Sequence, residues 1–241
     1  MAGILVASKK GGTGKSTLTT NLAVMRAIAG NDVCLVDCDT QSTSRQFIGR
    51  RVSEYPDRRS PHCVQVFGNT ARREIEGLAD RFTDIVVDVA GRQSMEMLQA
   101  MTARNIEHVI IPCQPSMYDL ETLPELASKI EEARCFNEQL RATVVITRAH
   151  TNKKVKTANE ARDFIEEIEG LALSSMKIFE RKAYQDCTIP GLSAWEWLHE
   201  RRAELPPYRA KSFSMKAADE MAEVYQVVFG RSFKLEGRVA A

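Results

Sequence analysis

The chain has 241 residues, which is enough for one large α/β domain with a well-buried core. Hydrophobic residues make up 44% of the chain and charged residues 27%, proportions that exclude an intrinsically disordered protein. The formal net charge is +1, so any binding to nucleic acid would depend on a local basic patch. No apolar run is long enough to span a bilayer, and the scattered cysteines are expected to be reduced thiols of a cytoplasmic protein.

Segments typical of strands and of helices alternate along almost the whole chain. Apolar runs rich in β-branched residues predict strands at 4–7, 33–36, 63–67, 84–89, 108–112, 142–147 and 175–179. Helical spacing is found between these runs, for example over 18–29, 123–133 and 158–168, and a last amphipathic helix is predicted over 214–229. The polar segment 50–61 is expected to be a surface connection. The alternation predicts a single-domain α/β protein over residues 1–241, with a doubly wound, mostly parallel sheet flanked by helices.

Residues 10–17 read Lys-Gly-Gly-Thr-Gly-Lys-Ser-Thr and lie between the first strand and the first helix. A glycine-rich loop in this position forms a phosphate cradle, because its backbone N–H groups turn inward and the helix N-terminus adds partial positive charge. Lys15 can reach the β- and γ-phosphates, and the Ser16 hydroxyl can ligate Mg²⁺. A second lysine, Lys10, is not needed for the cradle. The predicted nucleotide contacts in the loop are Gly11, Gly12, Thr13, Gly14, Lys15, Ser16 and Thr17.

Carboxylates follow two of the predicted strands. Asp37 and Asp39 end the second strand and could have separate roles in hydrolysis: one would support the Mg²⁺ shell, and the other would orient the attacking water. The alternative is that one of them caps the following helix. Asp88 ends the fourth strand, as in the usual second Mg²⁺ motif, and Gly91 would let the backbone approach the γ-phosphate.

Taken together, these motifs resemble those of the ParA/MinD group of ATPases, and within it a short ParA-type partition ATPase. The loop with an internal lysine carries the resemblance, although Lys9 stands where the strict phosphate-loop pattern has glycine. The alternative for the loop alone is a glycine-rich turn in an unrelated α/β protein. The matching segments are 10–17, 37–41, 85–91, 109–119, 144–148 and 178–191, in the order of the family.

The resemblance implies roles for particular residues. Lys10 would be the signature lysine that crosses a dimer interface to the partner's phosphates and acts in catalysis with Lys15 and Asp39. Asp39 matches the hydrolytic carboxylate, and Ser16, Asp39 and Asp88 would form the Mg²⁺ site. The segments that would enclose the adenine of ATP are represented by Thr147, Arg148, Phe179 and Arg181.

The same resemblance implies a cycle. Mg²⁺ and ATP would drive a sandwich homodimer that binds duplex DNA without sequence preference and so associates with the nucleoid. A centromere-binding ParB-like adaptor would stimulate the otherwise slow hydrolysis that releases the DNA. A local basic segment, 141–156, supports DNA binding, although a solvated basic loop is the alternative. The candidate DNA contacts are Lys153, Lys154, Lys156, Lys182, Lys211 and Lys216.

Two other classes of protein share this fold. A MinD-like ATPase, or another cargo-positioning ATPase acting on a surface other than DNA, is the main alternative. A basic amphipathic C-terminal helix would favour a membrane surface, but Gly230 and Gly237 interrupt the C-terminal segment, so no membrane is expected. A metal-cluster reductase would need ligating cysteines after the second carboxylate motif, and 88–112 contains none. Because the loop begins by residue 10, no N-terminal helix-turn-helix domain is expected.

Overall fold

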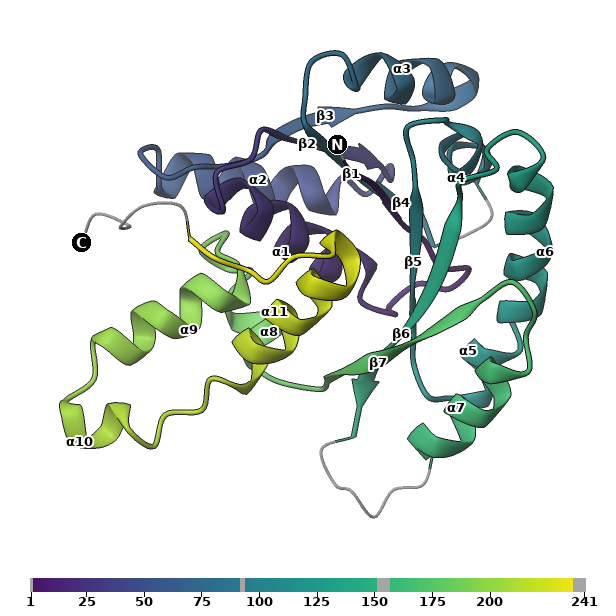
Figure 1. The fold of residues 1–241 in the computed structure, drawn as a ribbon. Coiled ribbons are helices and arrows are strands. Elements are labelled where there is room, and N and C mark those ends of the chain that lie inside the picture. The colour runs from purple at the N-terminus through teal and green to yellow at the C-terminus, as the bar shows by residue number, and fades with distance from the viewer. Residues whose placement is uncertain (1, 92–93, 151–156, 236–241) are drawn as a thin grey trace.

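Seven parallel strands form the central sheet of the computed structural model, which describes residues 2–91, 94–150 and 157–235 (Figure 1). The order across the sheet is β3-β2-β4-β1-β5-β6-β7, and every neighbouring pair runs in parallel. All seven predicted strands are confirmed, with ends that differ by a few residues. The strands are β1 (Ala2–Val6), β2 (Val33–Cys38), β3 (His62–Gln65), β4 (Asp84–Val89), β5 (His108–Cys113), β6 (Arg141–Ala149) and β7 (Ala172–Phe179).

Helices follow most strands and cover both faces of the sheet, so the expected doubly wound α/β class is confirmed (Figure 1). The longer helices are α1 (Lys15–Ile28), α2 (Thr43–Glu54), α3 (Ala71–Leu78), α4 (Met95–Thr102), α6 (Leu123–Arg134), α7 (Thr157–Glu166), α9 (Ala194–Ala203) and α11 (Lys216–Phe229). The short ones are α5 (Met117–Leu120), α8 (Ala183–Asp186), α10 (Pro207–Ala210) and the 3-10 turn η1 (Gly68–Thr70).

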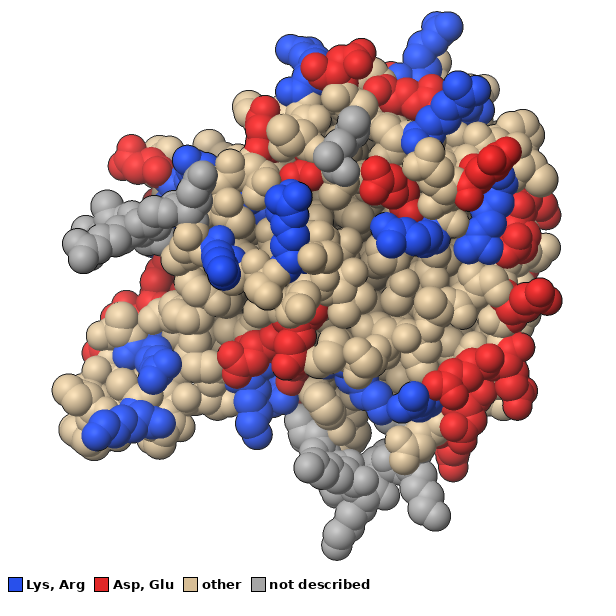
Figure 2. All heavy atoms as spheres, viewed as in Figure 1, with Lys and Arg blue, Asp and Glu red and all other residues tan. Residues whose placement is uncertain are grey.

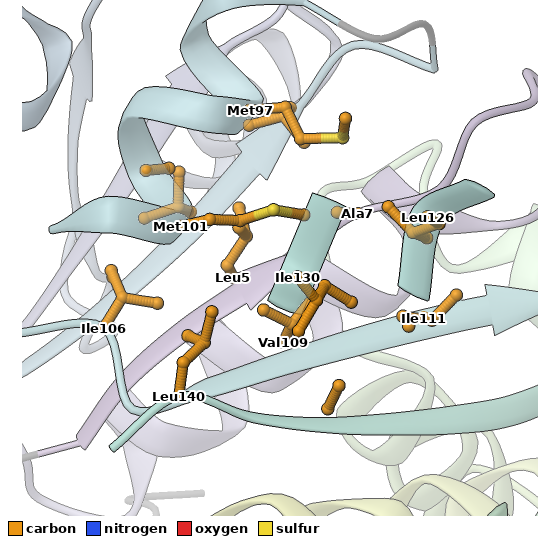
Figure 3. Packing of buried hydrophobic residues seen from close by; sticks show 14 of the residues in the cluster. Leu5, Ala7, Met97, Met101, Ile106, Val109, Ile111, Leu126, Ile130 and Leu140 are labelled. Carbon is orange, nitrogen blue, oxygen red and sulfur yellow. The ribbon is translucent and has the colours of Figure 1, made fainter. Parts of the chain in front are cut away.

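The sheet separates two hydrophobic clusters because successive side chains of a strand point to opposite faces. In β1, Leu5 packs in the cluster beneath α3, α4, α6 and α7, whereas Ile4 and Val6 pack beneath α1, α2, α9 and α11. Figure 3 shows the first cluster, in which Met97 and Met101 of α4 lie over Leu5. The continuous apolar runs of the central strands therefore reflect burial on both faces.

The prediction of a surface connection over 50–61 is wrong in its first part. Helix α2 continues to Glu54, and the side chain of Arg51 is fully buried. The Arg51 guanidinium donates to both carboxylate oxygens of Glu196 in α9, at 2.9 and 2.8 Å. The polar composition was misleading because a bidentate ion pair satisfies the buried arginine.

The strand order brings the loops after β1, β2 and β4 together at the C-terminal edge of the sheet. Asp88 at the end of β4 is paired in register with Val6 of β1 on one side and with Asp37 of β2 on the other. Strand order changes direction between β1 and β5, which is where open α/β sheets bind ligands. Among the residues that the structure describes, no helix combines the length and the apolar character needed to cross a bilayer.

Candidate functional site

The loop between β1 and α1 has the backbone geometry of a phosphate cradle. Gly12 and Gly14 have φ angles of +79° and +96°, which side-chain-bearing residues rarely adopt, and Gly14 lies directly before α1. Within the described part of the chain, no N–H group from Gly11 to Thr17 donates to a backbone carbonyl. These free donors at a helix N-terminus fit an anionic phosphate chain.

Neighbouring strands hold the loop in this conformation. The hydroxyls of Ser8 and Thr13 hydrogen-bond at 2.8 Å, and the Thr147 hydroxyl at the end of β6 donates to the Thr13 carbonyl at 2.7 Å. The Gln114 side-chain amide, which follows β5, donates to the Gly12 carbonyl at 3.0 Å. Because both carbonyls accept hydrogen bonds from residues in or after other strands, the shape of the loop is fixed by the surrounding fold.

Lys15, the first residue of α1, lies inside the loop with its ammonium group buried. Its Nζ donates to the Lys10 carbonyl at 2.9 Å and to the Ser8 hydroxyl at 3.3 Å. Burial lowers the pKa of Lys15, and the negative charges of Asp88 and Asp39 oppose this shift. The ammonium is thus held by neutral oxygens beside two carboxylates, a position from which it can bind a phosphate.

Asp88 at the end of β4 is fully buried, and protein donors occupy both of its oxygens. The Ser44 hydroxyl donates to Oδ2 at 2.6 Å, and the Thr19 hydroxyl lies 3.4 Å from Oδ1. Burial raises the pKa of Asp88 to about 6, a shift that hydrogen bonds from Ser44 and Ser16 and the charge of Lys15 keep from being larger. The structure therefore places Ser16, Lys15 and Asp88 together.

The two carboxylates after β2 have different surroundings. Asp37 is buried and accepts hydrogen bonds from the backbone N–H groups of Asp39 (3.0 Å) and Arg45 (2.8 Å). Since Arg45 lies in the first turn of α2, Asp37 caps that helix, as the alternative interpretation proposed. Asp39 is partly exposed and accepts from the Gln41 N–H at 2.9 Å, and its charge partly offsets the lowering of the Lys15 pKa by burial. Of the two, Asp39 has the position suited to a water-orienting carboxylate.

The side-chain oxygens of Ser16, Asp39 and Asp88 suit Mg²⁺ better than a metal ion that is bound by protein ligands alone. Within the described residues, no group of three or more His, Cys, Asp or Glu side chains could hold a metal ion. Mg²⁺ is typically bound by one or two carboxylates together with substrate phosphates and water. A hydroxyl from Ser16 and carboxylates from Asp39 and Asp88, beside an anion cradle, match that requirement.

Gly91 closes the site from the β4 side. A Cβ at this position would lie 2.8 Å from both the Lys10 carbonyl and the Lys15 Nζ, and 2.9 Å from the Gly11 nitrogen. Any side chain would therefore press on the loop and its lysine. The glycine keeps the loop after β4 in contact with the cradle.

Lys10 contacts helix α5 of its own chain. Its Nζ is 3.6 Å from Asp119 Oδ1 and sits over the Tyr118 ring, 5.2 Å from the centroid, so both partners come from α5. The Lys10 side chain is 39% exposed, whereas the neighbouring Lys9 forms an ion pair with Glu125 of α6. Sequence reasoning missed Asp119 as a partner, although this residue ends one of the segments that carry the family resemblance.

A cleft of about 560 Å³, open to solvent, adjoins the loop and brings the predicted adenine segments together. Glu220 of α11 organises one wall: it accepts from Arg181 Nε at 2.7 Å, from the Tyr184 hydroxyl at 3.1 Å and from the Phe179 N–H at 3.3 Å. No sequence motif indicated Glu220, and no role was predicted for Tyr184, although it lies in the matching segment 178–191. The lining residues include Thr13, Gly14, Thr17, Thr147, Arg148, Phe179, Arg181 and Tyr184.

The predicted DNA contacts are only partly described. Lys153, Lys154 and Lys156 lie outside the described residues. The other three, Lys182, Lys211 and Lys216, are exposed. The side chain of Lys182 is 84% accessible, with Asp186 at 3.3 Å. Figure 2 shows basic side chains over α9 and α10, acidic side chains over α7, and side chains of both signs over α6.

Comparison with known proteins agrees with this geometry. The carboxysome distribution maintenance protein A of Halothiobacillus neapolitanus is 26% identical over 198 residues, covering 80% of this chain and 86% of that protein. The chromosome-partitioning ATPase Soj of Thermus thermophilus is 31% identical over 166 residues, covering 57% of this chain and 65% of Soj. The ATP complex of a Cyanothece McdA variant has the same fold, with a TM-score of 0.68 at 13% identity over 100% of this chain and 99% of that one.

The match to a family model covers most of the chain. The model for the CobQ/CobB/MinD/ParA nucleotide binding domain matches residues 4–191, from β1 to the segment before α9. That range contains the phosphate loop, the three carboxylates and most of the residues around the cleft. The chain therefore belongs to the CobQ/CobB/MinD/ParA family of nucleotide-binding domains, and the expected likeness to ParA/MinD-type partition ATPases is confirmed.

Proposed function

We propose that this protein is an ATP-dependent partition ATPase, in which Mg²⁺ and ATP drive a homodimer and hydrolysis releases it. The observation that carries the proposal is Lys10, a second lysine beside a complete phosphate cradle that already contains the buried Lys15. One ammonium is enough to hold the phosphates of a single chain. The second, partly exposed ammonium is suited to the phosphates of another protomer.

Each residue of the site has a chemical role in this proposal. The backbone N–H groups of 11–17 and Lys15 bind the phosphates, and Ser16 holds Mg²⁺ with the support of Asp88. Bound Mg²⁺ would neutralise part of the negative charge of the phosphates. Asp39 orients the attacking water, while Asp37 fixes the first turn of α2. The cleft beside Thr147, Arg148, Phe179 and Arg181 receives the adenine.

Release of Lys10 from α5 is energetically feasible. The pair with Asp119 is 3.6 Å long, the Lys10 side chain is 39% exposed, and the buried Asp119 carboxylate keeps a hydrogen bond from the Gln114 N–H when the lysine leaves. Phosphates trapped between two protomers need a cation nearby, because an unpaired buried charge costs several kcal/mol. The partner's triphosphate is therefore the stronger attraction, and ATP favours the dimer.

Two cargoes are compatible with this cycle. We favour nonspecific duplex DNA, with nucleoid association in the cytoplasm and a ParB-like adaptor that stimulates hydrolysis, because a relative is a chromosome-partitioning ATPase and Lys182, Lys211 and Lys216 are exposed. Dimerisation would double the basic surface and steepen its salt-dependent affinity for DNA. The second candidate is positioning of another cargo, favoured by the likeness to a carboxysome distribution protein.

Gel filtration and retention on duplex DNA, each with ATP, ADP or no nucleotide, test the proposal. The parent chain should dimerise and bind DNA with Mg²⁺ and ATP alone, and Lys10→Ala should bind ATP but remain monomeric. Lys9→Ala is the matched control, because Lys9 pairs with Glu125 outside the cradle and should behave like the parent. If Lys10→Ala dimerised as the parent does, the proposal that Lys10 couples ATP binding to dimerisation would be refuted. ATP-dependent dimers that do not retain DNA would favour the other cargo.

A further inference from the structure

The hydroxyl of Ser44 is an unassigned group at the candidate metal site. Ser44 lies in the first turn of α2, is fully buried, and donates to Asp88 Oδ2 at 2.6 Å. The contact joins residues 44 positions apart, across the loop that carries Asp39. Neither the phosphate-loop pattern nor the two carboxylate motifs predicted a role for this serine.

A side chain can position another only if it is itself held in place. The turn that carries Ser44 is fixed by Asp37, whose Oδ2 accepts from the Arg45 N–H at 2.8 Å. Farther along α2, the fully buried Arg51 is bound through both guanidinium NH₂ groups by Glu196 of α9. Both parts of α2 are thus anchored, and the Ser44 hydroxyl is presented to Asp88 in a fixed direction.

The other oxygen of Asp88 has a weaker partner. Its Oδ1 lies 3.4 Å from the Thr19 hydroxyl, which donates to the Lys15 carbonyl at 2.9 Å. Ser16 also hydrogen-bonds to the carboxylate, but that residue is a candidate Mg²⁺ ligand, so Ser44, at 2.6 Å, is the short contact that would remain to orient Asp88 once Ser16 binds the ion. Without it, a buried carboxylate oxygen would lose its donor and turn to another one.

We propose that Ser44 is the positioning residue for Asp88, holding that carboxylate in the orientation that supports a divalent cation beside Ser16. The inference rests on the proposed function, because it assumes that the site binds Mg²⁺ together with a nucleotide. It also ties the first turn of α2 directly to the metal site. Removal of the hydroxyl weakens the response to Mg²⁺ while leaving the phosphate cradle intact.

The test is a Mg²⁺ titration of the full chain with a fluorescent ADP analogue, run beside a titration of the analogue in EDTA. Ser44→Ala should bind the analogue as the parent does in EDTA, but should need at least about tenfold more Mg²⁺ for half-saturation. Thr43→Ala, the exposed neighbour in the same turn, is the matched control and should shift by less than about twofold. Binding in EDTA also verifies that each variant is folded.

Two outcomes would overturn the inference while the proposed function stands. One is an unchanged Mg²⁺ requirement in Ser44→Ala. The other is an equal loss of affinity with and without Mg²⁺, which would mean that the hydroxyl only supports the fold. If the parent chain itself responded to neither Mg²⁺ nor nucleotide, the proposed function would fail, and the inference with it.

Discussion

Burial of Asp88 disfavours its ionised form and so lowers the stability of the fold at neutral pH, and Asp88→Asn tests this directly. The folded-state pKa is about 6, above the ordinary value of 3.8, so the folded chain holds the proton more tightly than the unfolded chain. The stabilising contribution of protonated Asp88 is therefore complete below about pH 4 and is lost as the pH rises through 6. Asparagine carries no charge and keeps an oxygen that can accept from Ser44.

The size of the effect follows from the shift. A difference of about 2 pH units corresponds to about 3 kcal/mol of unfolding free energy above pH 7. For a chain of this length, that is roughly 6–12 °C in Tm. Without nucleotide or metal, Asp88→Asn should melt higher than the parent at pH 8, and the difference should shrink towards pH 4.

Thermal unfolding followed by circular dichroism between pH 4 and 8 provides the measurement. Asp163→Asn is the control, because Asp163 is exposed on α7 and its replacement should change Tm little at any pH. A Tm difference between Asp88→Asn and the parent that is the same at pH 4 and pH 8 would refute the reasoning. So would a lower Tm for the variant at pH 8.

Three further predictions concern other parts of the molecule. Gly91→Ala should weaken ATP binding in fluorescence titrations by about tenfold or more, since its Cβ would meet the loop at 2.8 Å, whereas Gly77→Ala, with open space, should bind like the parent. Glu220→Gln should weaken nucleotide binding about tenfold, because it removes the charge that holds Arg181 in the wall of the cleft. Glu223→Gln, at an exposed position of the same helix, should bind like the parent. Equal affinities of the two variants would contradict this prediction. Burial lowers the pKa of His108 from 6.5 to about 4, so the folded chain loses about 3 kcal/mol as the pH falls between these values, and His108→Gln should show a flatter acid limb in Tm against pH.

The sheet and the phosphate loop could be predicted because their signals are local. A strand buried on both faces reads as a continuous apolar run, and 84–89 and 108–112 were found to within a residue. The loop is specified by consecutive glycines between such a run and a helix. Asp88 was predictable because a carboxylate at the end of a buried strand beside the loop has few structural alternatives.

The remaining parts of the site depend on contacts between segments far apart in the sequence. The residues alone did not separate the roles of Asp37 and Asp39; the family resemblance pointed to Asp39 as the hydrolytic carboxylate, and the structure adds that the Asp37 carboxylate caps the first turn of α2. Ser44 and Glu220 lie in helices whose sequences show only amphipathic spacing. That spacing predicts which face of a helix is buried, but it does not identify the polar residue on that face that contacts the site. Arg51 was assigned to a polar surface segment because its ion-pair partner, Glu196, lies 145 positions away in the sequence.

The position of Lys10 in a crystal structure with Mg²⁺ and a non-hydrolysable ATP analogue is the measurement that tests the central claim most directly. In the structure described above, Lys10 Nζ lies 3.6 Å from Asp119 of the same chain. The account predicts that, with the analogue bound, Lys10 leaves Asp119 and contacts the phosphates held by a second copy of the chain. A monomer with the analogue bound and Lys10 still on Asp119 would contradict it.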